Sequence, residues 1–489
     1  MTMLRAFLSA VSIAGRCGVS AVCLMTSVCQ AQSALPESLL QALRDTGFDA
    51  ANLSALVIPA QGGNAKLAHL DTRPMSPAST MKLVTTLVAL EELGPTYRWS
   101  TTLLADKPVQ KGTLKGPLYL QGQGDPNFTW DSLRDMLRNL RDQGVYRLQG
   151  DLVLDRAYFR PVRPDAGVPD FDESPQAYYN VIPDALLLNG NLLNIALASD
   201  GKQTTIRTGP DLQGMRVRTR IELNDSACDQ WDDDLIKART QQADKANLEI
   251  TVAGIFPRNC KSDTQLNVLD RNDYIARFVR TYWKEIGGSW TGAVKDGVAP
   301  ADATVLFTHR SESLATIVRL INKPSDNAMT RSVFMTLGET RPMEARAGSS
   351  TQAGALAVRA WFARKGLSDA NMVLDNGSGL SRIERISAQQ MAGLLQAGAR
   401  SPWYAEFASS LPIVGTDGTM RKRLKEALGP GRARIKTGSL RDTAAIAGYV
   451  RDPQDREWVV VAFVNADNAA RSRPVLDALI HWVASESAP

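Results

Sequence analysis

The sequence predicts an α+β protein in which a β-rich region interrupts a part made of helices and antiparallel strands. The segment 79–93 has the composition of a long apolar helix, whereas from Trp99 the chain changes to strand-like pieces that continue for about 170 residues. Helical periodicity returns at 274–288, and a strand followed by a hairpin occupies 433–466. The expected boundaries are 32–97 and 268–489 for a split first domain, and 98–267 for the inserted β-rich region with two subdomains.

The elements before the insertion are separated by turn signals. PESLLQALRDTGF (36–48) has the spacing of an amphipathic helix, and SALVIPA (54–60) and KLAHL (66–70) are strand-like segments around a QGGN turn. Helix 79–93 follows a proline and ends at a Gly-Pro pair. Since this helix is apolar on most sides, we expect it to be buried in a helical cluster.

Within the insertion, we expect a helix at 129–144 and loops rich in Pro, Asp and Tyr at 160–183. Its strand-like segments are WSTTLL, GPLYLQG, RLQGDLVLD, LLNIALAS, TTIRTG, MRVRTRIEL and NLEITVAGIF. After it, ARIKTGSL (433–440) is a predicted strand, and AAIAGYVR and WVVVAFVNA form a predicted hairpin around DPQDRE. The last helix begins at Pro474 and has no basic face, so we do not expect it to dock on a membrane.

The bulk composition is that of an ordinary soluble globular protein, with 44% hydrophobic and 22% charged residues in a chain of 489. The formal net charge is +5, of which Arg5 and Arg16 contribute two. The sequence contains no Lys/Arg-rich block with interleaved aromatic residues, so nucleic acid is not an expected partner. A mildly basic surface favours an anionic polymer only weakly.

The N-terminal segment has early positive charge, an apolar stretch and small residues near its end. This pattern predicts a signal peptide over 1–31, cut after Ala31, and hence export to the periplasm. Arg16 leaves an apolar run of about a dozen residues, which is too short to span a bilayer, so no transmembrane anchor is expected. Lipidation at Cys29 is an alternative, but the preceding TSV is a poor lipidation signal.

Five cysteines occur in the chain, and Cys17, Cys23 and Cys29 fall within the predicted signal peptide. The exported chain keeps Cys228 and Cys260, which predict one disulfide that closes a loop of about 32 residues. Such a bridge stabilises a protein by about 3–4 kcal/mol in the chain-entropy model. The alternative is two unrelated buried thiols.

Three short motifs are the candidates for chemistry. In STMK (79–82), a hydroxyl and an amine three residues apart lie on one face of a helix. A lysine in apolar surroundings loses affinity for its proton, so its neutral amine can activate the hydroxyl as a nucleophile. Ser199 and Lys202 have the same spacing in a polar stretch, so this motif alone does not establish a catalytic site. The other two motifs are SDN (325–327) and KTGS (436–439), and SDN and KTG each occur once.

Ser-x-x-Lys, Ser-Asp-Asn and Lys-Thr-Gly in this order resemble the motif set of the penicilloyl-serine transferases, namely penicillin-binding proteins and β-lactamases. The chain most closely resembles the D-alanyl-D-alanine carboxypeptidase/endopeptidase family of the penicillin-binding protein 4 type. Four further stretches carry this resemblance: GQGDP (122–126), DALLLNGN (184–191), DNGSGLSR (375–382) and GTDGTM (415–420). Ser79 and Ser325 are 246 residues apart, and the β-rich insertion of this family accounts for that separation.

The resemblance covers essentially the whole mature chain. It implies a transpeptidase-like domain, an antiparallel sheet flanked by helices, with the β-rich domain inserted between the Ser-x-x-Lys and Ser-Asp-Asn motifs. Gln123 departs from the family, which more often has glycine at this position, and we expect it to alter a loop and leave the chemistry intact.

The resemblance also implies a role for each motif residue. Ser79 forms an acyl-enzyme, and Lys82, if neutral, accepts its proton, although the base of this superfamily is disputed. Ser325 relays a proton to the leaving nitrogen, and Asn327 holds Lys82 or the substrate amide. Lys436 supplies positive charge for a terminal carboxylate.

The remaining expected contacts come from the KTGS strand. Thr437 places a hydroxyl beside the substrate carboxylate, and Gly438 belongs to the same substrate-binding segment. Backbone N–H groups of Ser79 and Ser439 form the oxyanion hole.

Structural alternatives exist for several of these residues when each is taken alone. The alternatives are a helix cap for Asn327, a solvated strand-edge charge for Lys436 and a turn residue for Ser325. In the DNGSGLSR stretch, Asp375 and Ser378 are expected to form a loop, and Gly377 and Gly379 to permit close backbone approach.

Other catalytic classes lack their signatures in this sequence. The three histidines, at positions 69, 309 and 481, do not accompany a G-x-S-x-G motif. No His/Cys cluster has metal-ligand spacing, and no phosphate-binding loop is present, so neither a metal nor a cofactor is expected.

We therefore expect a periplasmic serine D,D-peptidase that cleaves terminal D-Ala-D-Ala, D-Ala crosslinks of peptidoglycan, or both, and that β-lactams acylate. The alternatives are a β-lactamase or esterase of the same fold and a non-catalytic wall-binding module. Asp170, Asp172 and Glu173 are candidates to contact the free amine of a diamino-acid side chain, or they form a solvated loop. The sequence leaves the oligomeric state open.

Overall fold

The computed structural model describes residues 34–231, 235–244, 247–346, 348–429 and 431–486. The expected signal peptide and its cleavage point lie outside these ranges. Within them, no helix combines the length and the apolar character that a membrane crossing requires.

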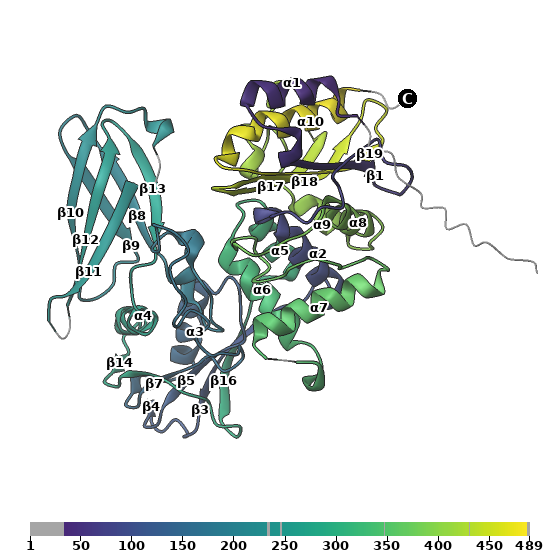
Figure 1. Cartoon of the computed structure of the whole chain (residues 1–489). Helices are drawn as coiled ribbons and strands as arrows, with labels where there is room; N and C mark the ends of the chain where they lie inside the picture. Colours follow the sequence, from purple (N-terminus) through teal and green to yellow (C-terminus); the bar gives the residue numbers. More distant parts are fainter. Residues whose placement is uncertain (1–33, 232–234, 245–246, 347, 430, 487–489) are drawn as a thin grey trace, which may run out of the picture. The chain divides into compact units, whose positions relative to one another are not determined.

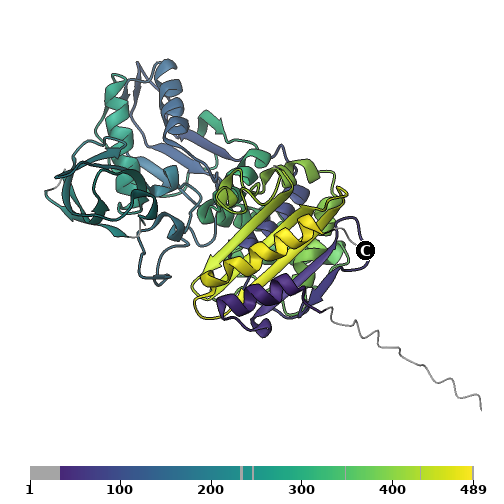
Figure 2. The same ribbon diagram turned by 90° about the horizontal axis from the view of Figure 1, so that it is seen from above.

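A five-stranded antiparallel sheet joins the two ends of the chain, in the order β17-β18-β19-β1-β2. Its strands are β1 (Leu53–Pro59), β2 (Leu67–His69), β17 (Ala433–Leu440), β18 (Thr443–Arg451) and β19 (Glu457–Asn465). Strand β1 pairs with β19 along its whole length, so both predicted pieces of the split domain contribute to one sheet. Helices α1 (Glu37–Thr46) and α10 (Arg473–Ser485) lie side by side across one face of it (Figure 2).

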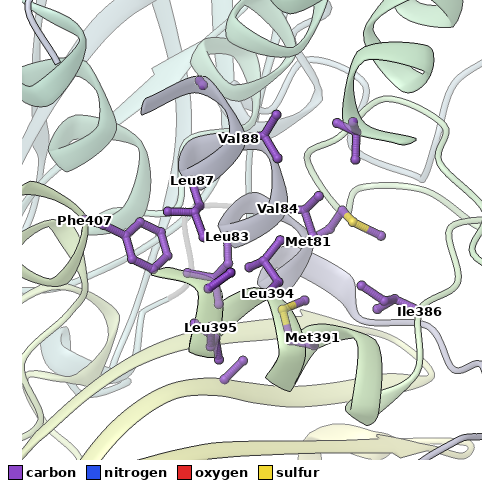
Figure 3. Packing of buried hydrophobic residues seen from close by; sticks show 14 of the residues in the cluster. Met81, Leu83, Val84, Leu87, Val88, Ile386, Met391, Leu394, Leu395 and Phe407 are labelled. Atoms are coloured by element: carbon purple, nitrogen blue, oxygen red, sulfur yellow. The ribbon is translucent and has the colours of Figure 1, made fainter. Parts of the chain in front are cut away.

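The other face of the sheet is covered by a helical cluster around α2 (Lys82–Leu93). The surrounding helices are α5 (Leu314–Asn322), α6 (Asn327–Glu339), α7 (Ser350–Arg364), α8 (Ala388–Ala399) and α9 (Tyr404–Ser410). Figure 3 shows Leu83 and Leu87 of α2 near Leu394, Leu395 and Phe407. Because α2 is apolar on most sides, it can be buried from every direction, and the predicted central helix is confirmed. Its first turn differs from the prediction, since Ala78–Met81 form a separate 3-10 turn, η2.

The β-rich region contains a mixed five-stranded sheet in the order β15-β7-β5-β3-β16. Its strands are β3 (Ser100–Ala105), β5 (Leu118–Gly122), β7 (Leu152–Asp155), β15 (Val294–Asp296) and β16 (Thr304–Arg310), and helices α3 (Trp130–Asp142) and α4 (Arg271–Glu285) accompany it. Strand β16 pairs with β3, and β15 pairs with β7. These pairings bear on the expected end of the insertion at residue 267. We propose that the inserted region ends near Ser311, because strands after 267 complete a sheet that begins before it.

Besides a short three-stranded sheet of β14 (Ser289–Trp290), β6 (Arg147–Leu148) and β4 (Thr113–Leu114), this region contains two longer three-stranded sheets (Figure 1). One has the order β13-β8-β9 and the other β10-β12-β11. Their strands are β8 (Leu193–Ser199), β9 (Thr204–Gly209), β10 (Met215–Asn224), β11 (Ile236–Gln242), β12 (Leu248–Pro257) and β13 (Lys261–Leu266). We propose that these two sheets are the second subdomain of the insertion. The predicted disulfide between Cys228 and Cys260 is present there, with a Cα–Cα distance of 5.4 Å.

Candidate active site

Ser79 lies on the η2 turn, directly before the buried helix α2. Two glycines let other segments approach this turn. A Cβ on Gly379 would lie 1.9 Å from the Ala78 carbonyl oxygen, and one on Gly438 would lie 2.6 Å from that of Pro77. Both separations are too short for a side chain. The expected close approach at Gly379 is therefore confirmed, and β17 packs on Ser79 in the same way.

Lys82 is fully buried behind Ser79. Its Nζ lies 3.0 Å from Ser79 Oγ, 2.6 Å from Asn327 Oδ1 and 2.6 Å from the Ser378 carbonyl oxygen. Burial lowers the pKa of Lys82 to about 7, although the carboxylates of Asp326 and Glu384 partly oppose the effect. A large fraction of Lys82 is therefore neutral near pH 7. In that form, it can accept the proton of the Ser79 hydroxyl.

Asn327 connects Lys82 to the inserted region. Its Oδ1 accepts from Lys82, while its Nδ2 donates to the Tyr179 carbonyl oxygen at 2.9 Å. These two contacts determine the orientation of the amide. The cap of α6 is Asp326, whose carboxylate accepts from the Met329 N–H at 2.7 Å. The alternative of Asn327 as a helix cap is therefore wrong.

Lys436 and Ser325 meet beside this group. Lys436 Nζ donates to Ser325 Oγ at 2.7 Å and to the Thr437 carbonyl oxygen at 2.8 Å. Lys436 is fully buried, so it is not a solvated strand-edge charge. Burial, and secondarily the charge of Lys82, hold the pKa of Lys436 well below its ordinary value. Ser325 has a φ of +71°, a left-handed conformation that costs a non-glycine residue about 1–3 kcal/mol.

The motif residues border a cleft of about 910 Å³. Residues from all three motifs line it: Ser79, Ser325, Asn327, Thr437 and Ser439. Lys82 and Lys436 are buried behind these residues. Gly438 does not line the cleft, but its lack of a side chain lets β17 pack against the turn that carries Ser79. Thr437 Oγ1 donates to Thr419 Oγ1 at 2.8 Å, which joins the GTDGTM stretch to the site. The same cleft is also lined by the candidate acidic residues Asp170, Asp172 and Glu173, together with Tyr178 and Tyr179.

Glu384 is a buried residue of this site that the sequence analysis missed. Its carboxylate accepts from the N–H groups of Asp375, Asn376, Gly377 and Gly379 at 2.8–3.2 Å. It thereby holds the DNGSG loop, whose Ser378 carbonyl contacts Lys82. The charged stretch SRIER around Glu384 is typical of an exposed surface. The only sequence signal for a buried acceptor was the nearby glycine-containing loop, whose N–H groups need hydrogen-bond partners. As expected, Ser378 forms part of the loop, since its hydroxyl donates to Asn376 Oδ1 at 2.6 Å.

Metal chemistry has no candidate centre in the described part of the chain, where no three His, Cys, Asp or Glu side chains gather in a metal-binding arrangement. The motif residues instead bring hydroxyl, amine and amide groups together at the cleft. Such a set is suited to nucleophilic attack on a carbonyl and to proton transfer.

Comparison with known proteins gives a family match over most of the chain. The profile of the D-Ala-D-Ala carboxypeptidase 3 (S13) family matches residues 35–486. A D-alanyl-D-alanine carboxypeptidase of Actinomadura sp. (strain R39) is 27% identical over 442 residues, which cover 86% of this chain and 79% of that protein. The D-alanyl-D-alanine carboxypeptidase DacB of Haemophilus influenzae is 27% identical over 403 residues and 80% of each chain. The crystal structure of penicillin-binding protein 4 from Haemophilus influenzae has the same fold, with a TM-score of 0.70, 23% identity and coverage of 88% of this chain and 94% of that one.

Proposed function

The chain belongs to the D-Ala-D-Ala carboxypeptidase 3 (S13) family, and from this premise we propose that Ser79 is the nucleophile of its D,D-peptidase reaction. The protein is a serine-type carboxypeptidase that acts on peptidoglycan peptides. The contact of Lys82 Nζ with Ser79 Oγ, at a buried position that lowers the pKa of the amine to about 7, is the observation that carries the assignment.

In the proposed acylation step, neutral Lys82 takes the hydroxyl proton as Ser79 Oγ attacks the carbonyl carbon of the penultimate D-Ala. The N–H groups of Ser79 and Ser439 stabilise the oxyanion, and one such donor contributes about 10²–10³ in rate. The C–N bond then breaks, and the proton passes through Ser325 to the leaving amine. Water hydrolyses the resulting ester and restores the Ser79 hydroxyl. The proton count therefore balances over one turnover.

We propose that Lys436 and Thr437 hold the terminal carboxylate of the substrate. Burial and, secondarily, the charge of Lys82 disfavour the protonated form of Lys436. An arriving carboxylate reverses this preference, because an opposite charge nearby favours the ammonium form. Lys436 can then be protonated to bind the substrate carboxylate while Lys82 stays neutral to accept the Ser79 proton.

β-Lactams present a reactive amide to the same cleft, so we propose that they acylate Ser79. The test is intact-mass measurement of the purified protein after exposure to benzylpenicillin, followed by peptide mapping. We expect one penicilloyl adduct on the peptide that contains Ser79, and none on the Ser79→Ala variant. An unmodified wild-type protein, or an adduct at another residue, contradicts the proposal. Rapid turnover of nitrocefin would instead favour a β-lactamase.

Among the candidate contacts for a diamino-acid amine, Asp170 and Glu173 are available in the cleft, and Asp170 is the one that we test. Asp172 is engaged in its own loop, where it accepts from the Ser174 N–H and from Asn180 Nδ2. Asp170 lines the cleft and forms no ion pair or side-chain hydrogen bond with a described residue. We expect Asp170→Asn to raise KM for a peptide with a free side-chain amine and to leave its N-acetylated analogue unaffected. Equal effects on both peptides contradict this role.

We propose that the protein reaches peptidoglycan by export, directed by the signal over residues 1–31. N-terminal sequencing of the protein recovered from the periplasm tests this. A mature chain that begins at Gln32 supports the proposal, whereas a retained Met1 contradicts it.

A further inference from the structure

We infer that one exposed face of the β10-β12-β11 sheet binds the anionic stem peptides of intact peptidoglycan, an inference that rests on the proposed function. Strand β10 pairs in parallel with β12, and β11 pairs antiparallel to β12 on its other side. The three strands lie side by side in Figure 1. Directly paired residues of neighbouring strands project to the same face of a sheet.

The register gathers the basic side chains of both outer strands on one face, which we call the basic face. Its nine positions are, row by row, Arg216–Glu249–Gln241, Arg218–Thr251–Arg239 and Arg220–Ala253–Lys237. All five of its basic residues are exposed. The alternate positions of β11 and β12 face the core: Ile236, Ala238, Ile250 and Val252. The basic face is therefore the solvent face of the sheet.

Most of the charge on this face is not neutralised by a neighbour. Glu249 pairs with Arg218 at 2.7 Å, whereas no residue that the structure describes forms an ion pair with Arg216, Arg220 or Arg239. The nine positions carry a formal charge of +4, and the exposed Glu222 in the next row of the same face reduces the total to +3. The outer strands are about 10 Å apart, and the central strand has small residues in two of the three rows. Cations on both outer strands can therefore converge on one anionic chain.

The basic face adjoins the loop that forms one wall of the active-site cleft. Lys237 Nζ donates to the Glu173 carbonyl oxygen at 3.1 Å and lies 3.4 Å from Ser174 Oγ. A hollow of about 330 Å³ beside this loop is lined by Lys237 and Arg239. It shares four loop residues with the Ser79 cleft: Glu173, Ser174, Tyr178 and Tyr179. A polymer with one peptide at Ser79 can therefore place a neighbouring peptide on the basic face.

The chemistry of the face favours peptidoglycan over nucleic acid. Stem peptides carry free carboxylates, which the arginine guanidinium binds in a bidentate manner. Proteins that bind single-stranded nucleic acid stack its bases on aromatic side chains. None of the nine positions of the basic face is aromatic.

The test measures binding of the mature protein to purified sacculi, in the Ser79→Ala background so that the polymer stays intact. The triple variant R216Q/R220Q/R239Q removes the three unpaired arginines and keeps both the Arg218–Glu249 pair and the Lys237 contact. The matched control R400Q/R471Q/R473Q removes three exposed arginines that lie outside the insertion. Co-sedimentation is measured over a range of NaCl concentrations. Circular dichroism and the thermal midpoint report whether each variant folds.

We expect the triple variant to bind sacculi about tenfold more weakly at low salt, with a shallower salt dependence, and the control to stay within about twofold of the parent. With Ser79 intact, the ratio of D-Ala release from sacculi to release from a soluble peptide should fall by a similar factor. Unchanged binding, an equal loss in the control, or preference for a DNA fragment over sacculi overturns the inference. If the triple variant does not fold, R216Q/R220Q is judged by the same criteria. Failure of the proposed function is separate, because it shows as a wild-type protein that neither cleaves the soluble peptide nor takes up penicillin.

Discussion

Lys436 Nζ lies 2.7 Å from Ser325 Oγ, although the two residues are 111 positions apart in the chain. This contact joins the second and third motifs at the back of the cleft. It directs the Ser325 hydroxyl while the backbone of Ser325 is held at a φ of +71°. A serine that keeps a strained backbone and a buried amine partner is suited to relay a proton, because neither group needs to reorganise during the reaction.

The first prediction concerns this hydroxyl. We expect Ser325→Ala to slow acylation by benzylpenicillin by about 10²–10⁴, the usual contribution of a positioned proton-transfer group. Stopped-flow measurement of the acylation rate tests this. Ser325→Gly is the matched control, since glycine relieves the left-handed strain and also lacks the hydroxyl. Both variants should be slow, and recovery of the rate in the glycine variant alone would assign Ser325 a backbone role.

The second prediction follows from the buried amine of Lys82. Because its pKa is about 7, the acylation rate should rise about tenfold per pH unit below pH 7. The rise should level off above pH 7, where most of Lys82 is neutral. The measurement is the pH dependence of the second-order acylation constant between pH 5 and 9 in a constant-ionic-strength buffer.

The lowered pKa of Lys82 also makes the free energy of unfolding depend on pH. The folded-state pKa of Lys82 is below its ordinary value of 10.5, so the unfolded chain binds the additional proton between about pH 7 and 10.5. The contribution of Lys82 to the free energy of unfolding therefore rises with pH across this window. A Lys82→Met variant should lose this rise in a denaturant series.

An acylation rate that does not change between pH 5 and 7 contradicts the assignment of Lys82 as the base.

Local patterns in the sequence predicted the elements that carry the motifs. Strand 433–440 and its hairpin alternate clearly between turn signals, and helix 79–93 is uniformly apolar, so both were identifiable without tertiary information. The pairing between distant segments was not identifiable from these local patterns. Strand β16 joins β3 across about two hundred residues, with Arg310 opposite Ser100, and nothing in its own composition indicates that partner.

The candidate site shows the same limit. The motif residues were visible because their types are chemically specific, and the structure brings Ser79, Lys82, Asn327 and Ser378 into contact. Glu384 was hidden, because a glutamate between arginines and an isoleucine is normally a surface residue. Its burial is intelligible only once the loop N–H groups that it satisfies have been located.

The third prediction concerns Glu384. A glutamine side chain has one accepting oxygen where Glu384 has two. Glu384→Gln therefore leaves at least one N–H of the loop unsatisfied, which costs about 1–3 kcal/mol of stability. The negative charge of Glu384 also raises the pKa of Lys82. Its removal should therefore move the acid limb of the acylation profile to lower pH. A thermal melt and the acylation profile test the two effects, and a lower melting temperature with an unmoved limb would restrict Glu384 to a structural role.

The last prediction concerns the packing of the DNGSG loop on Ser79, the proposed nucleophile. Gly379 has a φ of +82°, and an added Cβ would lie 1.9 Å from the Ala78 carbonyl oxygen and 2.7 Å from the Ser79 nitrogen. Gly379→Ala must therefore displace either the loop or the η2 turn, and we expect penicillin acylation to fall by at least about 10² because Ser79 and Lys82 lose their mutual geometry. Gly47→Ala is the control, since Gly47 has a similar φ of +74° with no atom within 4 Å of the added Cβ. The control isolates the cost of the left-handed backbone, about 1 kcal/mol, from the effect of the clash. Equal acylation rates in the two variants would show that Ser79 tolerates displacement of this loop.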